Sequence, residues 1–410
     1  MEIFYILLVL LIASRIFAEV AVRFGQPELF GEIMAGILLG LIVHHFDNSF
    51  PILSDLDSNA IFTAVKDLGI FFLLLLGGIE LRPGDMAKAS KAGILVAAGG
   101  MVIPFFFALV IGYSFLPQSG YKTAQIIFLG TALSVTAVPV AIKVLMDMNL
   151  LESKMGRMIV SAAVIDDALS LLLLAVLTAV IKSGSLPGGL ELARLGMNVV
   201  LFFVLTSLIG YYVFPAAGKL FRKTRADEFE LSMLLTAAFA YAVLAEILGM
   251  HFILGAFQAG LFFSRKQTSE ETYNNIQSKI KGMTNGFLAP VFFASVGLHL
   301  DISALLVIPV FVLLLIVTAT LGKLLGAGLA ARLTGMNMKE AAAIGMAMNA
   351  RGAVELVIAD IALRAGVFSV PSPPPPIVAE LFSAVVIMAV ATTLLTPISL
   401  HLIFRRSKLD

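Results

Sequence analysis

The chain has 410 residues, of which 59% are hydrophobic and only 13% are charged, and its formal net charge is +1. A soluble domain carries about 25% charged residues, so a folded monomer of this composition would lack the polar surface that keeps a protein in water. The mean hydropathy of +0.99 therefore indicates an integral membrane protein. The balanced charge argues against a nucleic-acid partner, and the absence of cysteine excludes disulfides and thiolate metal sites.

Apolar runs separated by loop residues predict an all-α polytopic membrane protein with about thirteen transmembrane helices. The first run follows the N-terminus without a basic region or a cleavage site, so we expect a span there and not a removed signal peptide. The predicted spans are 3–22, 30–46, 60–80, 91–116, 121–146, 155–181, 193–220, 229–248, 251–264, 284–300, 303–333, 339–364 and 377–404.

Loop charges predict the orientation of these spans, because cytoplasmic loops of membrane proteins are enriched in Lys and Arg. If the N-terminus lies outside, the inside loops include the basic stretches 219–225 and 405–408. The outside loops then include the acidic stretch 47–57 and the proline-rich stretch 371–376. The sequence therefore predicts an external N-terminus and a cytoplasmic C-terminus.

The two halves of the chain resemble each other at an offset of roughly 215 residues, although any two apolar segments share some similarity. The stretch FFLLLLGGIEL from Phe71 recurs loosely as FFASVGLHLDI from Phe292. Six spans, a linker helix and six more spans would place the halves in opposite orientations, as in many secondary transporters. We predict a first repeat at 1–190, a linker helix at 191–226 and a second repeat at 227–410, without a soluble regulatory domain.

The run at 155–181 contains two adjacent acids, Asp166 and Asp167, in an otherwise apolar sequence. Insertion scales put an aspartate at the bilayer centre at about 2.5–3.5 kcal/mol, so acids there are usually functional. Neighbours on a helix point about 100° apart, so both carboxylates can line one cavity without facing each other. A carboxylate that holds either a cation or a proton is the minimal device for exchange. The alternative is a structural pair that neighbouring groups neutralise.

The run at 303–333 contains Lys323, about twenty residues from its start. This depth makes it difficult for the ammonium group to reach the headgroups. We expect Lys323 to pair with one of the aspartates, in a pair that an arriving cation could break. The alternative is a lysine that extends to the cytoplasmic headgroups near Arg332.

Two runs contain signals for broken helices. Pro139 lacks an N–H group and is expected to free backbone carbonyls around Thr136, although a proline alone also fits an ordinary kink. In the matching run of the second half, Gly352 can open the helix, Arg351 can balance the negative helix ends, and Glu355 can pair with Arg351 one turn later. Broken helices in matching positions of two halves point to a binding site at the midplane.

Other functional classes explain these residues less well. An intramembrane aspartyl protease needs facing acids on separate helices, whereas Asp166 and Asp167 share one helix. A channel would surround its charges with a wet pore, whereas a lysine and carboxylates in a dry core favour occluded binding. We therefore predict a transporter and not an enzyme. A cation-coupled solute symporter is the strongest alternative from another functional class.

The combined motifs resemble the second monovalent cation:proton antiporter family, which includes sodium/proton antiporters and the membrane domains of glutathione-gated potassium efflux systems. The resemblance covers essentially the whole chain. The matching stretches are QPELFGEIMAGILLGLI from Gln26, SVTAVPVA from Ser134, the pair Asp166–Asp167, GLHLDI from Gly297, Lys323 in its span, and MNARGAVELV from Met348.

The resemblance implies the antiporter fold with crossed discontinuous helices, a homodimer and an elevator-like movement of the core. It implies that Asp167 is the principal cation and proton site and that Asp166 pairs with Lys323. It further implies electrogenic exchange of two protons per cation in a prokaryotic-type inner membrane, with sodium as the leading ion, potassium as the alternative and no cofactor. Some sodium-transporting members have glutamate directly after the Arg-Gly pair, where this chain has Ala353.

Overall fold

The computed structural model describes residues 2–45, 59–80, 91–136, 145, 150, 153–183, 189–221, 228–263 and 270–405. All regular elements within these ranges are helices, which confirms the predicted all-α class. Six of the described helices are long and apolar enough to cross a bilayer, and three shorter apolar helical stretches accompany them. The count of thirteen spans stays a prediction.

The chain folds into two compact units, and each unit combines an early and a late segment. Unit 1 comprises Met1–Gly84 and Pro187–His299, and unit 2 comprises Asp85–Leu186 and Leu300–Asp410. The division in space therefore differs from the division into repeats along the sequence, because each unit takes one segment from each predicted repeat.

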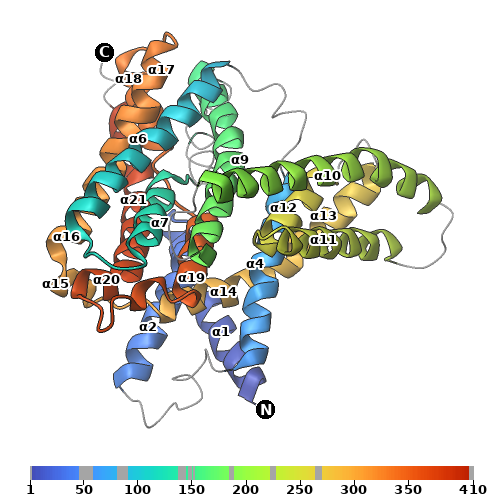
Figure 1. The fold of residues 1–410 in the computed structure, drawn as a ribbon, viewed down its shortest axis with the longest axis horizontal. Helices are drawn as coiled ribbons and strands as arrows, with labels where there is room; N and C mark the ends of the chain where they lie inside the picture. Colours follow the sequence, from blue (N-terminus) through green and yellow to red (C-terminus); the bar gives the residue numbers. More distant parts are fainter. Residues whose placement is uncertain are drawn as a thin grey trace. The chain divides into compact units, whose positions relative to one another are not determined.

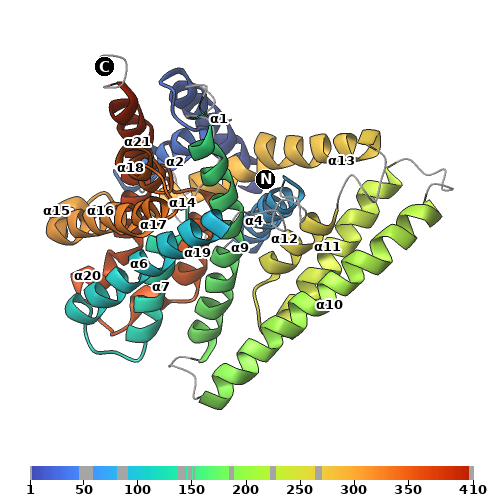
Figure 2. The same ribbon diagram turned by 90° about the horizontal axis from the view of Figure 1, so that it is seen from above.

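Unit 1 is built from apolar helices and one amphipathic helix. The long helices α10 and α11 lie side by side, as both ribbon views show (Figures 1 and 2). The helices of unit 1 are α1 (Glu2–Arg23), α2 (Glu28–His45), α4 (Ala60–Glu80), α10 (Gly189–Phe221), α11 (Phe229–Ile247), α12 (Phe252–Phe262), α13 (Glu270–Met283), the π-turn η3 (Thr284–Leu288) and α14 (Ala289–Leu298).

Glycines allow the backbones of α2 and α14 to touch. A Cβ atom added to Gly36 would lie 2.0 Å from the carbonyl oxygen of Ala294, and one added to Gly297 would lie 2.2 Å from that of Ile33. No side chain larger than hydrogen fits between backbones at that distance. Close approach through small residues is typical of helix pairs in membranes, where packing replaces the hydrophobic effect.

One helix begins earlier than the sequence predicts. The predicted span at 284–300 is preceded by α13, which begins at Glu270 and continues through η3 into α14. The sequence of α13 is polar, and its apolar residues Tyr273, Ile276 and Ile280 are buried. The hydroxyl of Tyr273 also donates a 2.8 Å hydrogen bond to the carbonyl oxygen of Ile79 at the end of α4.

In unit 2, helices α6 and α21 each pack against several other helices. Helix α6 packs against α7, α9, α16 and η4, and α21 packs against α16, α18 and α19. The helices are α6 (Lys91–Phe115), α7 (Lys122–Ser134), α9 (Lys154–Ser183), α15 (Ala304–Val307), α16 (Pro309–Lys323), the π-turn η4 (Leu324–Gly328), α17 (Leu329–Leu333), α18 (Met338–Ala347), α19 (Ala353–Arg364), the 3-10 turn η5 (Val367–Ser369), α20 (Pro376–Ala379) and α21 (Leu381–Arg405).

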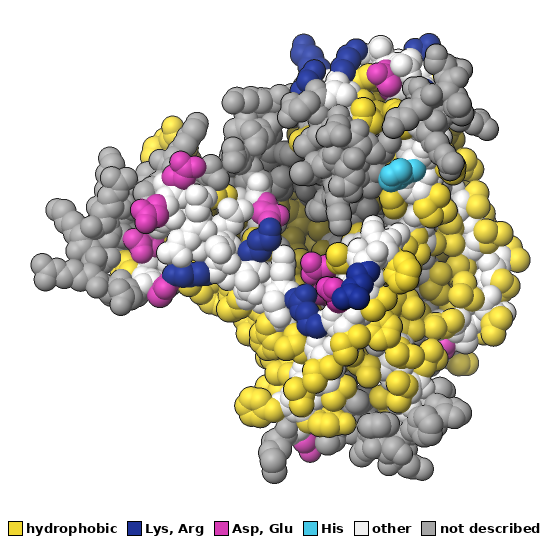
Figure 3. Space-filling model, turned by 180° about the vertical axis from the view of Figure 1, so that it is seen from behind, with side chains coloured by type: hydrophobic (Ala, Val, Ile, Leu, Met, Phe, Trp, Pro, Cys, Tyr) yellow, Lys and Arg dark blue, Asp and Glu magenta, His cyan; other side chains and the backbone are white. Residues whose placement is uncertain are grey.

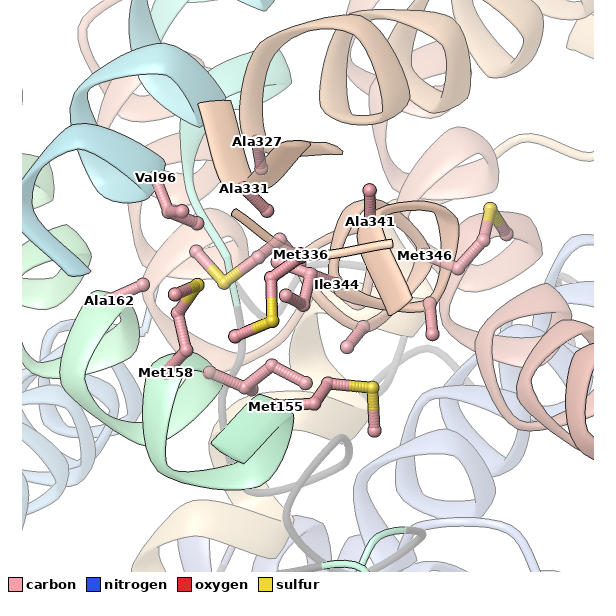
Figure 4. Packing of buried hydrophobic residues seen from close by; sticks show 14 of the residues in the cluster. Val96, Met155, Met158, Ala162, Ala327, Ala331, Met336, Ala341, Ile344 and Met346 are labelled. Carbon is pink, nitrogen blue, oxygen red and sulfur yellow. The ribbon is translucent and has the colours of Figure 1, made fainter. Parts of the chain in front are cut away.

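Methionines and alanines fill the core between α6, α9 and α18. Figure 4 shows Met155 and Met158 of α9 close to Met336 and to Ile344 of α18. Alanines on η4, α17 and α18 leave the space that these flexible side chains occupy. The cluster holds the second segment of unit 2 against the first.

Hydrophobic side chains also cover the outside of the protein. Figure 3 shows them over much of the described surface, with charged side chains in small groups. On α1, large apolar residues recur every four positions and are 46–77% exposed, which are Phe4, Leu8, Ile12, Ile16 and Val20. Contiguous apolar surface of this kind is a liability in water. It suits the acyl chains of a bilayer.

We expect the α2–α14 contact to limit the stability of unit 1. Gly36→Ala should lower the free energy of unfolding by about 1–3 kcal/mol, because the methyl group overpacks against backbone that cannot move aside. The measurement is the melting temperature of purified protein in detergent. Gly77→Ala is the matched control, since nothing lies within 4 Å of a Cβ at that position. Equal melting temperatures for the two variants would contradict the expectation.

Candidate functional site

Helix α7 ends in the interior of unit 2. Its last helical residue is Ser134, and Val135 adopts an extended conformation with φ −64° and ψ 145°. The last turn of a helix leaves backbone carbonyls without a helical partner. Residues 131–136 are buried, and a bilayer offers no water to such oxygens. Donors must therefore come from elsewhere in the protein.

Arg351 supplies three of these donors. Its Nη1 donates to the carbonyl oxygen of Ala132 at 2.7 Å and also to that of Val135, and its Nη2 donates to that of Leu133 at 2.7 Å. Arg351 is only 1% exposed. The planar guanidinium fits this task because its donors diverge from a rigid fork. A positive charge also suits the C-terminal end of a helix.

Lys323 donates further hydrogen bonds at the end of α7. Its Nζ donates to the carbonyl oxygen of Ser134 and, at 2.7 Å, to the hydroxyl oxygen of Thr136. The same Nζ lies 3.8 Å from Oδ1 of Asp166 in α9, and both side chains are fully buried. Lys323 is the last residue of α16 before the π-turn η4. The ammonium group therefore joins α16 to α7 and α9.

Arg351 itself lies in an interruption between α18 and α19, which we call the α18–α19 break (residues 348–352). Helix α18 ends at Ala347, α19 begins at Ala353, and Gly352 is extended between them. The first turn of α19 carries Glu355, whose Oε2 lies 3.9 Å from Nε of Arg351. The break brings a backbone interruption and two opposite charges next to the end of α7.

The two carboxylates of this cluster accept no hydrogen bond from the described part of the chain. Both oxygens of Asp166 and both oxygens of Glu355 are buried, and no described residue donates a hydrogen bond to any of them. Their cationic neighbours use their donors on the α7 backbone instead. A buried carboxylate in this condition gains strongly from a proton or a metal cation. Asp166 and Glu355 are therefore the candidate residues for such binding.

The structure brings together most of the residues predicted from sequence. Asp166, Thr136 and Lys323 form one group, Arg351 and Glu355 form the adjacent group, and Gly352 lies in the break that separates α18 from α19. Two predicted residues cannot be placed in this way. Asp167 is a residue of α9, but its side chain lies outside the described residues, as does Pro139 as a whole.

The sequence did not single out two hydroxyl groups of α21 that contact the break and the end of α18. Thr393 of α21 contacts the backbone of Arg351, and Thr396 donates to the carbonyl oxygen of Met346 at 3.3 Å. The signal in the sequence is weak, because it consists of three threonines in the apolar run ATTLLTP. No charge marks these positions, so their role emerges only from the contacts.

Comparisons with known proteins identify the family of the chain. The family described as "Sodium/hydrogen exchanger, transmembrane" matches residues 6–406. The Na(+)/H(+)-K(+) antiporter GerN of Bacillus cereus is 28% identical over 396 residues, which cover 97% of this chain and 95% of GerN. The Na(+)/H(+) antiporter of Enterococcus hirae is 28% identical over 410 residues, which cover 98% of this chain and 97% of the relative.

A solved structure shows the same fold. The sodium proton antiporter MjNhaP1 from Methanocaldococcus jannaschii, determined at pH 8, superposes with a TM-score of 0.70 at 17% sequence identity. The superposition covers 99% of this chain and 98% of that one. These findings confirm the resemblance to cation:proton antiporters that the motifs predicted. Because the family match extends over nearly the whole chain, the protein belongs to the transmembrane sodium/hydrogen exchangers.

Proposed function

We propose that the protein exchanges a monovalent cation for protons across a membrane, with sodium as the leading cation. The observation that carries the proposal is the carboxylate of Asp166, which is fully buried, accepts no hydrogen bond from the described residues and lies 3.8 Å from Lys323. Family membership supports the same activity. The proposal makes the protein a transporter without a cofactor, and the cation is its substrate.

The proposed binding site consists of Asp167, Asp166 and Thr136. Asp167 directly follows Asp166 in α9, so the two backbones are adjacent beside the end of α7. Thr136 contributes its hydroxyl oxygen, and oxygen ligands suit hard cations. A dehydrated cation bound there would exclude a proton from the same carboxylate, and a proton would exclude the cation.

Lys323 has a second function in this proposal. In the absence of a cation, its ammonium group compensates the charge of Asp166 across 3.8 Å. A bound cation would take over that compensation and displace the lysine from the pair. The resemblance to electrogenic members of the family supports a second proton released at this step. The exchange would then move two protons for each cation.

The division of the molecule suggests how the site could reach both sides. All described residues of the proposed site belong to unit 2, and unit 1 contributes none of them. We propose that unit 2 moves as an elevator while unit 1 serves as the scaffold and forms a homodimer. The N-terminus would lie outside and the C-terminus in the cytoplasm of a prokaryotic-type inner membrane.

Potassium is the second candidate ion. The name of GerN, a Na(+)/H(+)-K(+) antiporter, is the specific observation that favours it. A cation-coupled symporter of organic solutes remains the alternative from another functional class. We further propose that the chain contains inverted repeats at 1–190 and 227–410, joined by a linker helix at 191–226. These repeats would give rise to the crossed helix breaks.

Replacing the proposed principal acid tests the site. Asp167→Asn should reduce exchange to the level of liposomes without protein, because an amide cannot alternate between a proton and a cation. The measurement is sodium-induced dequenching of a pH-sensitive dye in proteoliposomes. Asp301→Asn is the control, since it makes the same chemical change at an exposed position of unit 2. Exchange retained by the Asp167 variant would refute the site.

Replacing Lys323 separates its two functions. Lys323→Met leaves the charge of Asp166 buried and unpaired, which costs about 3–5 kcal/mol in comparable cases. We therefore expect a lower melting temperature, and we expect Asp166→Asn in the same chain to restore much of it. Exchange by the single variant should also change its dependence on membrane potential or on pH. A variant unchanged in both respects would remove Lys323 from the mechanism.

The ions themselves distinguish the candidate functions. An antiporter should collapse an imposed proton gradient when sodium alone is added, without any organic solute. We expect sodium to act at a lower concentration than potassium, because sodium is the leading ion in the proposal. The assay compares sodium, lithium and potassium at several pH values in proteoliposomes. A response that requires an organic solute would favour symport, and a response to potassium alone would reverse the order of the ions.

A further inference from the structure

The α18–α19 break leaves backbone hydrogen-bonding groups that α18 and α19 do not satisfy. Arg351 lies between α18 and α19, so neither its N–H nor its C=O takes part in a regular helical ladder. Residues 350–352 are buried. Buried backbone groups without partners are costly, and lipid offers no substitute. A donor and an acceptor must therefore reach Arg351 from another element.

A single hydroxyl group supplies both. The Oγ1 atom of Thr393 accepts a 2.9 Å hydrogen bond from the N–H of Arg351 and donates a 3.0 Å hydrogen bond to its carbonyl oxygen. A hydroxyl can do this because it has one donor and two acceptor lone pairs. Thr393 is 7% exposed. Both polar groups of the Arg351 backbone are thereby satisfied by one side chain of α21.

The neighbouring threonines show that this contact is specific. Thr392 is also fully buried, but its hydroxyl donates only to carbonyls of its own helix, those of Met388 at 2.9 Å and Ala389 at 3.1 Å. A threonine in a helix commonly donates a hydrogen bond from its hydroxyl to the carbonyl oxygen three or four residues earlier. Thr393 departs from that habit and turns to the break instead.

From these contacts we infer that Thr393 is a positioning residue for ion exchange. Its hydroxyl holds the backbone of Arg351 in the broken conformation. The guanidinium of Arg351 in turn fixes the end of α7, which is followed by Thr136. Without the hydroxyl, the break can rewind toward continuous helix and draw the guanidinium away from the α7 carbonyls. The inference rests on the proposed function, because it concerns the same cation site.

The test uses three variants of the full-length protein. Thr393→Val removes the hydroxyl and keeps the shape of the side chain, Thr393→Ser restores the hydroxyl, and Thr392→Val removes a buried hydroxyl that serves only its own helix. Two quantities are measured for each. One is the sodium concentration that gives half-maximal dequenching in proteoliposomes, and the other is deuterium uptake by the peptide that spans residues 346–353.

We expect Thr393→Val to raise the half-maximal sodium concentration about tenfold, as the loss of two buried hydrogen bonds would allow. Its peptide should also exchange deuterium faster. Thr393→Ser and Thr392→Val should remain close to the original protein in both measurements. A Thr393→Val protein that matches Thr392→Val in sodium dependence would overturn the inference, even if its melting temperature falls.

The two measurements also separate this inference from the proposed function. If the unaltered protein exchanges no cation at any pH, the proposed function fails, and deuterium uptake alone decides whether Thr393 holds the break. If the protein exchanges sodium and Thr393→Val leaves the sodium dependence unchanged, the positioning role fails and the proposed function stands.

Discussion

The carbonyl oxygens at the C-terminal end of α7 impose a constraint that organises the whole of unit 2. The helix stops at Ser134 inside the protein, where neither water nor lipid supplies a hydrogen-bond donor. Arg351 and Lys323 supply the donors, one from the α18–α19 break and one from the end of α16. The end of α7 is therefore satisfied only when three distant parts of the sequence meet. The same contacts that complete the packing also place two positive charges in the site.

Because Arg351 and Lys323 donate their hydrogen bonds to α7, they do not donate to the carboxylates of Asp166 and Glu355. Arg351 directs Nη1 and Nη2 at the α7 backbone, and its Nε remains 3.9 Å from Glu355. Lys323 likewise bonds to oxygens of α7 and lies 3.8 Å from Asp166. The positive charges compensate the carboxylates at these distances without satisfying their lone pairs. A carboxylate that is compensated but not hydrogen-bonded can accept a small cation or a proton, which is what the proposed exchange requires.

The features that could be predicted from the sequence are those that cost free energy in a membrane. A charge in an apolar run is expensive, so Asp166, Lys323 and Arg351 were recognisable without a structure. Helix α13 was missed because its polar sequence resembles a loop by hydropathy, although Tyr273, Ile276 and Ile280 follow the spacing of an amphipathic helix. The role of Thr393 was hidden for another reason. Threonines in helices usually bond to their own backbone, as Thr392 does, and a sequence cannot show which of two neighbours departs from that habit.

The charge balance of the site favours singly charged ions. Lys323 and Arg351 carry two positive charges, and Asp166 and Glu355 carry two negative charges when ionised. Asp167, the next residue of α9, adds one negative charge to this neutral set. One proton or one monovalent cation would offset that addition, whereas a divalent cation would leave an excess charge where water cannot screen it. The formal charges of these five side chains therefore support the proposed alternation between sodium and protons.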